Sequence, residues 1–111
     1  MLLFGTTKLF DKDLDLVEKR GKDIQKLEQI IQSLVWEEVL PQRLHDHPLK
    51  GNWKNHRELH IEPDWLLIYK KTSKEIIAVR TGTHSDLFLS IHFLYLGKRI
   101  SLISTVEKQH W

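Results

Sequence analysis

The sequence has no cysteine among its 111 residues. Disulfide bonds and thiolate metal sites are therefore excluded, and the composition fits a reducing compartment such as the cytosol. Long apolar runs are also missing. The longest, from Leu87 to Leu96, is interrupted by Ser90 and His92 and has about half the length that a membrane-spanning helix needs. Because the N-terminal apolar stretch is too short for a signal peptide, we expect a cytoplasmic enzyme or binding domain.

No strong excess of charge of either sign is present, since 17 basic and 15 acidic residues leave a net charge of +2. The excess is uneven along the chain. Residues 1–40 are net acidic, whereas residues 41–88 and 89–111 are each net basic. A basic second half is compatible with binding a polyanion, but so small an excess does not establish nucleic-acid binding. The length and the apolar fraction of 41% indicate one globular domain.

Only three prolines and five glycines interrupt the chain, and the first part has a helical period. Apolar residues recur at helical spacing over residues 7–20, which predicts an amphipathic helix that ends at Gly21. A second helix follows over residues 24–40, where Pro41 forces its end. Two helices joined by a tight glycine turn predict an antiparallel helical hairpin with one apolar face.

After Pro41 the pattern changes to that of strands. We expect short strands at residues 1–4 and near residue 47, an alternating strand over 55–62, an apolar central strand over 65–70 and a return strand over 75–81. The predicted fold class is α+β, with the N-terminal helical hairpin packed on a small antiparallel sheet. Residues 89–111 fit either one or two further strands or a loosely docked tail.

Groups that transfer protons cluster in the strand region. Alternation places His56, Glu58 and His60 on one face, opposite Leu59 and Ile61. If the helices cover the leucine face, the histidine face is open to a ligand. Three further residues are expected at the same end of the sheet as this face. They are Asp64 in the turn after the strand, Arg80 near the end of the return strand and His84 in the following loop.

Such a set suits RNA cleavage by the RNA's own 2′-hydroxyl. That reaction needs a base for the hydroxyl, an acid for the leaving 5′-oxygen and a cation for the phosphate. Histidine serves as acid or base near neutral pH, and Arg80 offers a planar fork to phosphate oxygens. Trp65 and Phe88 are candidates to stack on unpaired bases.

Each of these residues also has a simpler interpretation. The His45-x-His47 pair suggests a metal ligand, but isolated pairs of this kind mostly lie in surface loops. Trp65 is more often a core residue than a stacking platform, and Arg80 is by default a surface cation or a partner of Glu58 or Asp64. Two further acidic residues, Glu62 and Asp86, are expected to be solvated.

Two long motifs bring a family into view: DHPLKGNWKNHRELHIEPDWLLIYK at residues 46–70 and RTGTHSDLF at residues 80–88. Together with LVEKRGKDIQKL in the helical hairpin, they resemble the YafQ-type branch of the RelE/ParE toxin superfamily. The resemblance extends over residues 6–88. It implies a RelE/ParE-like fold and the toxin of a type II toxin–antitoxin pair, a ribosome-dependent endoribonuclease that cleaves mRNA in the ribosomal A site without a metal or another cofactor.

The resemblance also implies roles for individual residues. His84 is the expected general acid, and Arg80 the expected stabiliser of phosphate charge. Asp64, His60 and His47 together activate or orient the 2′-hydroxyl, and which of the three is the base stays open. Two aromatic residues, Trp65 and Phe88, fall at positions linked to mRNA placement.

The partners implied by the resemblance are the ribosome with its mRNA and a cognate antitoxin. The antitoxin is expected to carry a ribbon-helix-helix or similar DNA-binding domain, so that operator DNA is reached only through it. A local basic face would contact ribosomal RNA. Its candidate residues are Lys50, Lys54, Arg57, Lys70 and Lys71.

The chain departs from the family pattern at its C-terminal end. We expect a toxin domain over residues 1–88 and a C-terminal extension over residues 89–111, which starts beside His84 and Phe88 and is placed to obstruct the mRNA path or the antitoxin groove. Two alternatives therefore remain beside the active nuclease. One is an inactive or tail-blocked toxin that only binds antitoxin, and the other is a ParE-like inhibitor of a protein target.

Overall fold

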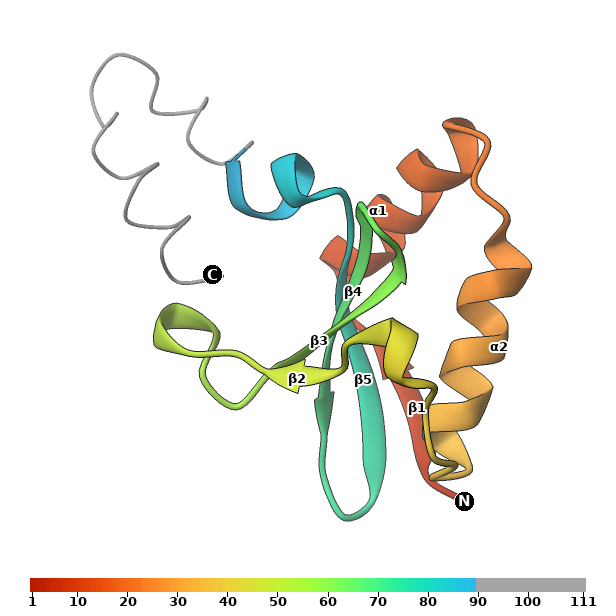
Figure 1. The fold of residues 1–111 in the computed structure, drawn as a ribbon, viewed down its shortest axis with the longest axis vertical. Coiled ribbons are helices and arrows are strands. Elements are labelled where there is room, and N and C mark those ends of the chain that lie inside the picture. The colour runs from red at the N-terminus through yellow and green to blue at the C-terminus, as the bar shows by residue number, and fades with distance from the viewer. Residues whose placement is uncertain (90–111) are drawn as a thin grey trace.

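The computed structural model describes residues 1–89, so the extension expected over residues 89–111 lies, apart from Leu89, outside the described residues. Two helices and a five-stranded sheet make up the fold (Figure 1). The helices are α1 (Lys8–Lys19) and α2 (Ile24–Val35); the strands are β1 (Leu3–Thr6), β2 (His47–Pro48), β3 (Arg57–Glu62), β4 (Trp65–Lys71) and β5 (Glu75–Gly82). Short helical turns are η1 (Gln42–Leu44), η2 (Gly51–Trp53) and η3 (Ser85–Leu89). No helix in the described part is long and apolar enough to cross a membrane.

The sheet has the order β1-β5-β4-β3-β2 and is mixed rather than wholly antiparallel. Strands β2 to β5 pair antiparallel, as predicted, but β1 runs parallel to β5 at the far edge. The first strand therefore lies beside the last strand of residues 1–89. A four-residue strand carries no local signal of its partner, so this pairing was not foreseen from the sequence.

Thr7 connects the start of α1 to the sheet. Its Oγ1 accepts a hydrogen bond from Phe10 N (3.0 Å), which caps the helix, and donates one to Val79 O in β5 (2.7 Å). The second helix is shorter than predicted and ends at Val35, because Glu37 adopts a left-handed conformation (φ 57°) and its N–H bonds back to Leu34 O.

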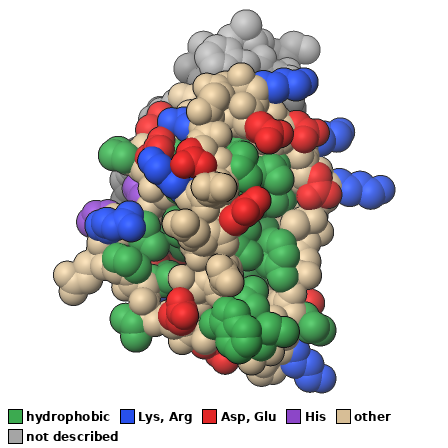
Figure 2. Space-filling view, turned by 90° about the vertical axis from the view of Figure 1, so that its right-hand side faces the viewer, with side chains coloured by type: hydrophobic (Ala, Val, Ile, Leu, Met, Phe, Trp, Pro, Cys, Tyr) green, Lys and Arg blue, Asp and Glu red, His purple; other side chains and the backbone are tan. Residues whose placement is uncertain are grey.

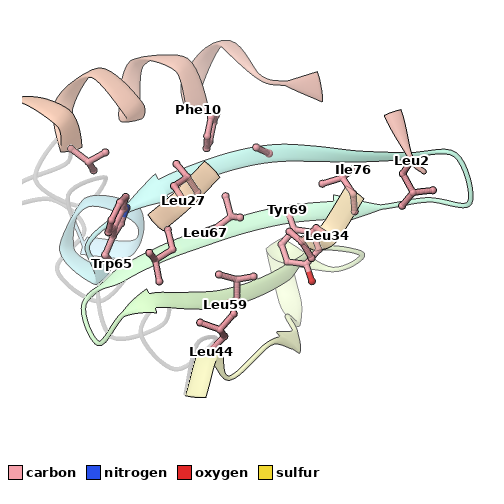
Figure 3. Close-up of a cluster of buried hydrophobic side chains, with 13 residues drawn as sticks. Leu2, Phe10, Leu27, Leu34, Leu44, Leu59, Trp65, Leu67, Tyr69 and Ile76 are labelled. Carbon is pink, nitrogen blue, oxygen red and sulfur yellow. The ribbon is translucent and has the colours of Figure 1, made fainter. Parts of the chain in front are cut away.

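Apolar side chains pack on both faces of the sheet. The larger cluster lies between the sheet and the helices, and ten of its members are labelled in Figure 3, including Phe10, Leu27, Leu59 and Tyr69. The smaller cluster lies on the opposite face and contains Leu49, Leu66, Ile68, Leu87 and Phe88. β4 contributes to both clusters, as expected of a central strand. On the side where α2 lies, charged and apolar side chains are intermixed and histidines are visible only at one margin (Figure 2).

Candidate active site

The histidine face lies opposite the helices. Leu59 and Ile61 belong to the helix-side core, so Glu58 and His60 of β3 project to the other face, as their alternation predicts. Strand β2 then places His47 directly opposite Glu58. This pairing brings the His47 ring to within 6.4 Å of the His60 ring, centroid to centroid.

Glu58 lies at the centre of this face with a side chain only 4% exposed. Its Oε1 is 3.5 Å from Nε2 of His47 and 3.5 Å from Nε2 of His60. Among the described residues its Oε2 has no hydrogen-bond partner. Burial raises the pKa of Glu58, and the positive charge that His47 and His84 can carry opposes this only in part. The sequence placed Glu58 on this face but not in the site.

His60 is the hub of a row of rings. Its centroid is 5.8 Å from that of His84 on one side and 5.7 Å from that of His45 on the other. Burial lowers the pKa of His60, and the neighbouring His84 lowers it further. A histidine with a depressed pKa is neutral at physiological pH and is therefore able to accept a proton.

Asp64 holds His84 through one oxygen. Its Oδ1 accepts hydrogen bonds from the backbone N–H of His84 (2.9 Å) and from the ring Nδ1 (2.6 Å). The carboxylate therefore fixes both the ring orientation and the tautomer. Burial acts to raise the pKa of Asp64, but the bonds from His84 outweigh it and the pKa is lowered.

Carboxylates fix the segment around His84 at two further backbone N–H groups. Asp13 of α1 accepts from Thr81 N (3.1 Å), and Asp86 accepts from Thr83 N (2.9 Å). Asp86 is itself held by Arg20, at the C-terminal end of α1, through two hydrogen bonds. The expectation that Asp86 is solvated was therefore wrong, because its side chain is 19% exposed and paired. Helix α1 thus anchors the segment that carries His84.

Arg80 pairs with neither Glu58 nor Asp64. Its Nε and Nη2 donate to the carboxylate of Asp13 at 2.6 and 3.1 Å, and both side chains are mostly buried. The third nitrogen, Nη1, makes no hydrogen bond among the described residues, so one edge of the guanidinium is available to a phosphate.

The aromatic residues differ most from expectation. Trp65 is 1% exposed in the helix-side core, where its Nε1 donates to Thr81 Oγ1 (3.0 Å). A side chain buried to this extent does not stack on a base in this conformation, so its expected role in mRNA placement stays a prediction. Phe88 is 2% exposed and packs its ring against those of Trp53 and His84. Trp53, half-buried in η2 and also in edge contact with His56, is an aromatic side chain that the described part of the site presents.

The predicted basic face is divided between the two sides of the sheet. Lys70 alternates with Leu66 and Ile68 and so shares the histidine face, and Lys50 and Lys54 flank Trp53 on exposed positions. The other two candidates line a cavity of about 720 Å³ on the helix side: Arg57 and Lys71. These two residues therefore lie apart from the histidine face.

Glu62 lies on the helix side of the sheet and not on the histidine face. A register shift in β3 between His60 and Glu62 turns its carboxylate towards the helices, where it binds Lys22 (2.6 Å) and Lys26 (2.8 Å). It is paired rather than solvated. Within residues 1–89 no three potential ligands lie close enough to hold a metal ion together.

The arrangement as a whole combines a neutral histidine, a histidine paired with a carboxylate and an arginine at one end of a sheet. These groups match the base, the acid and the phosphate-binding cation of RNA cleavage. Sequence reasoning missed Glu58, Asp13 and Trp53. The alternation and the aromatic side chain were visible signals for Glu58 and Trp53, whereas nothing in the sequence connects Asp13 to Arg80, 67 residues away.

Comparison with known proteins agrees with this geometry. Residues 3–89 match the family model described as the bacterial toxin of type II toxin–antitoxin system, YafQ. The mRNA interferase toxin YafQ of Escherichia coli K12 is 48% identical over 80 residues, which cover 71% of this chain and 87% of that protein.

Solved structures give the same result. The crystal structure of YafQ from E. coli BL21(DE3) is 42% identical and superposes with a TM-score of 0.75, covering 79% of this chain and 99% of that one. YafQ in the E. coli DinJ–YafQ complex is 43% identical with a TM-score of 0.74, and the match covers 79% of this chain and 99% of that chain. The helices on a mixed sheet described above are therefore the YafQ fold. The chain belongs to the YafQ family of bacterial toxins of type II toxin–antitoxin systems.

Proposed function

We propose that this toxin cleaves mRNA in the ribosomal A site by attack of a 2′-hydroxyl on the adjacent phosphate. Membership of the family and the name of its E. coli relative support the coarser statement, that the chain is a toxin and an endoribonuclease of the mRNA interferase type. The observation that carries the mechanism is the ring contact between His60, which is partly buried, and His84, whose Nδ1 is hydrogen-bonded to Asp64.

His60 is the general base in this proposal. It takes the proton of the 2′-hydroxyl while the 2′-oxygen forms a bond to phosphorus. Its lowered pKa keeps the ring neutral, whereas the lowered pKa of Asp64 makes that carboxylate a weak base. Glu58 and His47 hold His60 in place, because the Glu58 carboxylate lies between the two imidazoles.

His84 is the general acid. It donates a proton to the 5′-oxygen as the bond from phosphorus to that oxygen breaks, which leaves a 2′,3′-cyclic phosphate and a 5′-hydroxyl. Asp64 orients the ring by its hydrogen bond of 2.6 Å to Nδ1. Arg80 stabilises the charge that develops on the phosphate oxygens.

When the toxin is inactive, its partner is a cognate antitoxin, as DinJ is the partner of YafQ in the E. coli complex. We assign it a DNA-binding domain, so that the complex contacts operator DNA through the antitoxin. On the ribosome, Lys70, which shares the histidine face, and the exposed Lys50 and Lys54 are the cations available to ribosomal RNA.

A single-turnover cleavage assay on programmed ribosomes tests the mechanism. The rate is measured from pH 5 to pH 9 for the full chain and for His60→Ala, Asp64→Asn and His84→Ala. We expect His84→Ala to lose at least 100-fold in rate, as general acid catalysis typically contributes about 10²–10⁴-fold. The acidic limb of the pH–rate profile should vanish in His60→Ala and persist in Asp64→Asn.

Two results would contradict the proposal. Loss of the acidic limb in Asp64→Asn but not in His60→Ala would transfer the base role to Asp64. Cleavage that proceeds equally well on naked mRNA would remove the ribosome from the mechanism. Growth arrest on induced expression of the full chain, abolished by His84→Ala, connects the cleavage to toxicity.

A further inference from the structure

The segment that carries His47 has little sheet pairing of its own. Strand β2 is two residues long and pairs with β3 only at His47 and Pro48. The side chain of His47 is 40% exposed, yet its Nε2 must stay near the buried Glu58 to act on His60. Two register pairs fix a strand weakly. The C-terminal side of the segment is held by a hydrogen bond from Leu49 N to His56 O (2.9 Å), so the N-terminal side needs contacts of its own.

Asp46, the residue before His47, supplies these contacts on the other side of the sheet. Its Oδ1 accepts a hydrogen bond of 2.5 Å from the hydroxyl of Tyr69, and its Oδ2 accepts one of 3.0 Å from Nη2 of Arg57. Arg57 Nε lies 3.3 Å from both oxygens. Tyr69 is 1% exposed in the helix-side core, labelled in Figure 3, so the carboxylate is bound to a rigid point of β4.

The two faces of an extended chain connect this anchor to the site. Because neighbouring side chains point in opposite directions, holding Asp46 on the helix side directs His47 to the histidine face. The backbone carbonyl of His45 then accepts a hydrogen bond of 2.5 Å from Nδ1 of His47. A carbonyl can only accept, so Nδ1 carries the proton and Nε2 is the nitrogen directed at Glu58.

We propose that Asp46, Arg57 and Tyr69 form a positioning network for His47, and through it for the Glu58–His60 pair. The inference rests on the proposed function, since it assigns a purpose to the placement of His47. It also gives Arg57 a role other than contact with ribosomal RNA. None of the three residues touches the reacting atoms; they act by fixing the direction of the neighbouring histidine.

Epistasis with His47 tests the network. Asp46→Ala and Tyr69→Phe are each made in the full chain and in a His47→Ala background, and single-turnover cleavage on ribosomes is measured. We expect Asp46→Ala to lower the rate about tenfold or more at saturating ribosome concentration, because misplacement by about 1 Å can cost 10²-fold. Tyr69→Phe, which removes one of the bonds, should lose less. Neither substitution should lower the rate further once His47 is absent.

Two controls separate positioning from general loss of stability and from ribosome binding. Val17→Ala removes a buried methyl pair in α1, far from β2, and should lower the melting temperature without changing the saturated rate. Arg57→Lys should retain more activity than Arg57→Ala, since it keeps a donor for Asp46. If Arg57 contacts ribosomal RNA instead, Arg57→Ala weakens ribosome binding while Asp46→Ala leaves cleavage unchanged, and the proposal fails.

A second readout needs no cleavage. In the free protein, cross-relaxation between the ring protons of His47 and His60 should be visible by NMR, as their centroids are 6.4 Å apart, and should disappear in Asp46→Ala. If it persists, the network does not position His47. If it disappears while the wild-type chain cuts no mRNA, the network stands and the nuclease function fails.

Discussion

Asp13 gives the most quantitative test of how α1 supports the site. Its carboxylate accepts three hydrogen bonds, from Nε and Nη2 of Arg80 and from the backbone N–H of Thr81. The Arg80 and Asp13 side chains are 14% and 12% exposed. Asp13→Ala therefore leaves a mostly buried cation without its counter-ion and a backbone donor without its acceptor.

The expected loss follows from that geometry. Removing one partner of a buried ion pair costs about 3–5 kcal/mol, and the residual exposure of this pair favours the lower end. We expect Asp13→Ala to lower the free energy of unfolding by about 3 kcal/mol, a large share of the 5–15 kcal/mol typical of a domain. Because 1 kcal/mol shifts the melting temperature of a domain of this size by about 4–8 °C, the midpoint should fall by more than about 10 °C.

Urea denaturation at neutral pH, followed by circular dichroism, measures the change. Asp15→Ala is the matched control, because Asp15 is an exposed aspartate of the same helix and shares the change in helix propensity. It should stay within about 0.5 kcal/mol of the wild type. Asp13→Leu combined with Arg80→Met should be more stable than Asp13→Leu alone, since no unpaired charge remains. A loss below about 1 kcal/mol in Asp13→Ala, or a double variant less stable than the single one, would refute the reasoning.

Three further predictions concern other parts of the site. Burial raises the pKa of Glu58, so its ionised form destabilises the native state, and Glu58→Gln should raise the free energy of unfolding at pH 7.5. This gain should fade as the pH drops through the folded pKa towards 4.5. Denaturation curves of the wild type and the variant, measured at several pH values, should therefore converge at low pH. Gly82→Ala should cost about 1–3 kcal/mol, because φ is 152° and a Cβ would lie 2.9 Å from Oδ2 of Asp86; thermal unfolding measures it. Trp53→Ala should weaken mRNA cleavage with little loss of stability. Trp65→Ala should lower the free energy of unfolding by about 3–5 kcal/mol, which is measured as a sharp fall in the melting temperature.

Periodicity predicted the elements that bury one continuous face. The first helix, the alternating strand of Leu59 and the apolar strand β4 lie within one or two residues of their predicted bounds, because their burial follows the local repeat. The end of α2 did not follow from the sequence, since Glu37 takes a left-handed conformation that glycine usually adopts. The bulge that turns Glu62 to the helices was equally hidden, as one extra residue in the ladder leaves no mark on composition.

Long-range pairs decided what the pattern left open. Alternation could place Arg80 near the site but could not name its partner, because Asp13 lies 67 residues earlier on a helix. Trp65 shows the same limit in the opposite direction. Its aromatic side chain and its place in the family motif suggested an mRNA contact, yet the strand directs it to the helix-side face, where it is buried. Two consecutive residues of a strand project to opposite sides of the sheet.

Glu58 shows why depth matters as much as direction. Its place on the histidine face was predictable, but an alternating residue on an open face is ordinarily solvated, and nothing local distinguishes it from Glu62. Glu58 is buried because β2 places His47 directly opposite it. The position of His47 depends in turn on the hydrogen bonds of Asp46. A buried carboxylate between two imidazoles can be exchanged for its amide without a change in shape. Glu58→Gln should therefore make the protein more stable and the toxin slower, a combination that a merely structural glutamate would not produce.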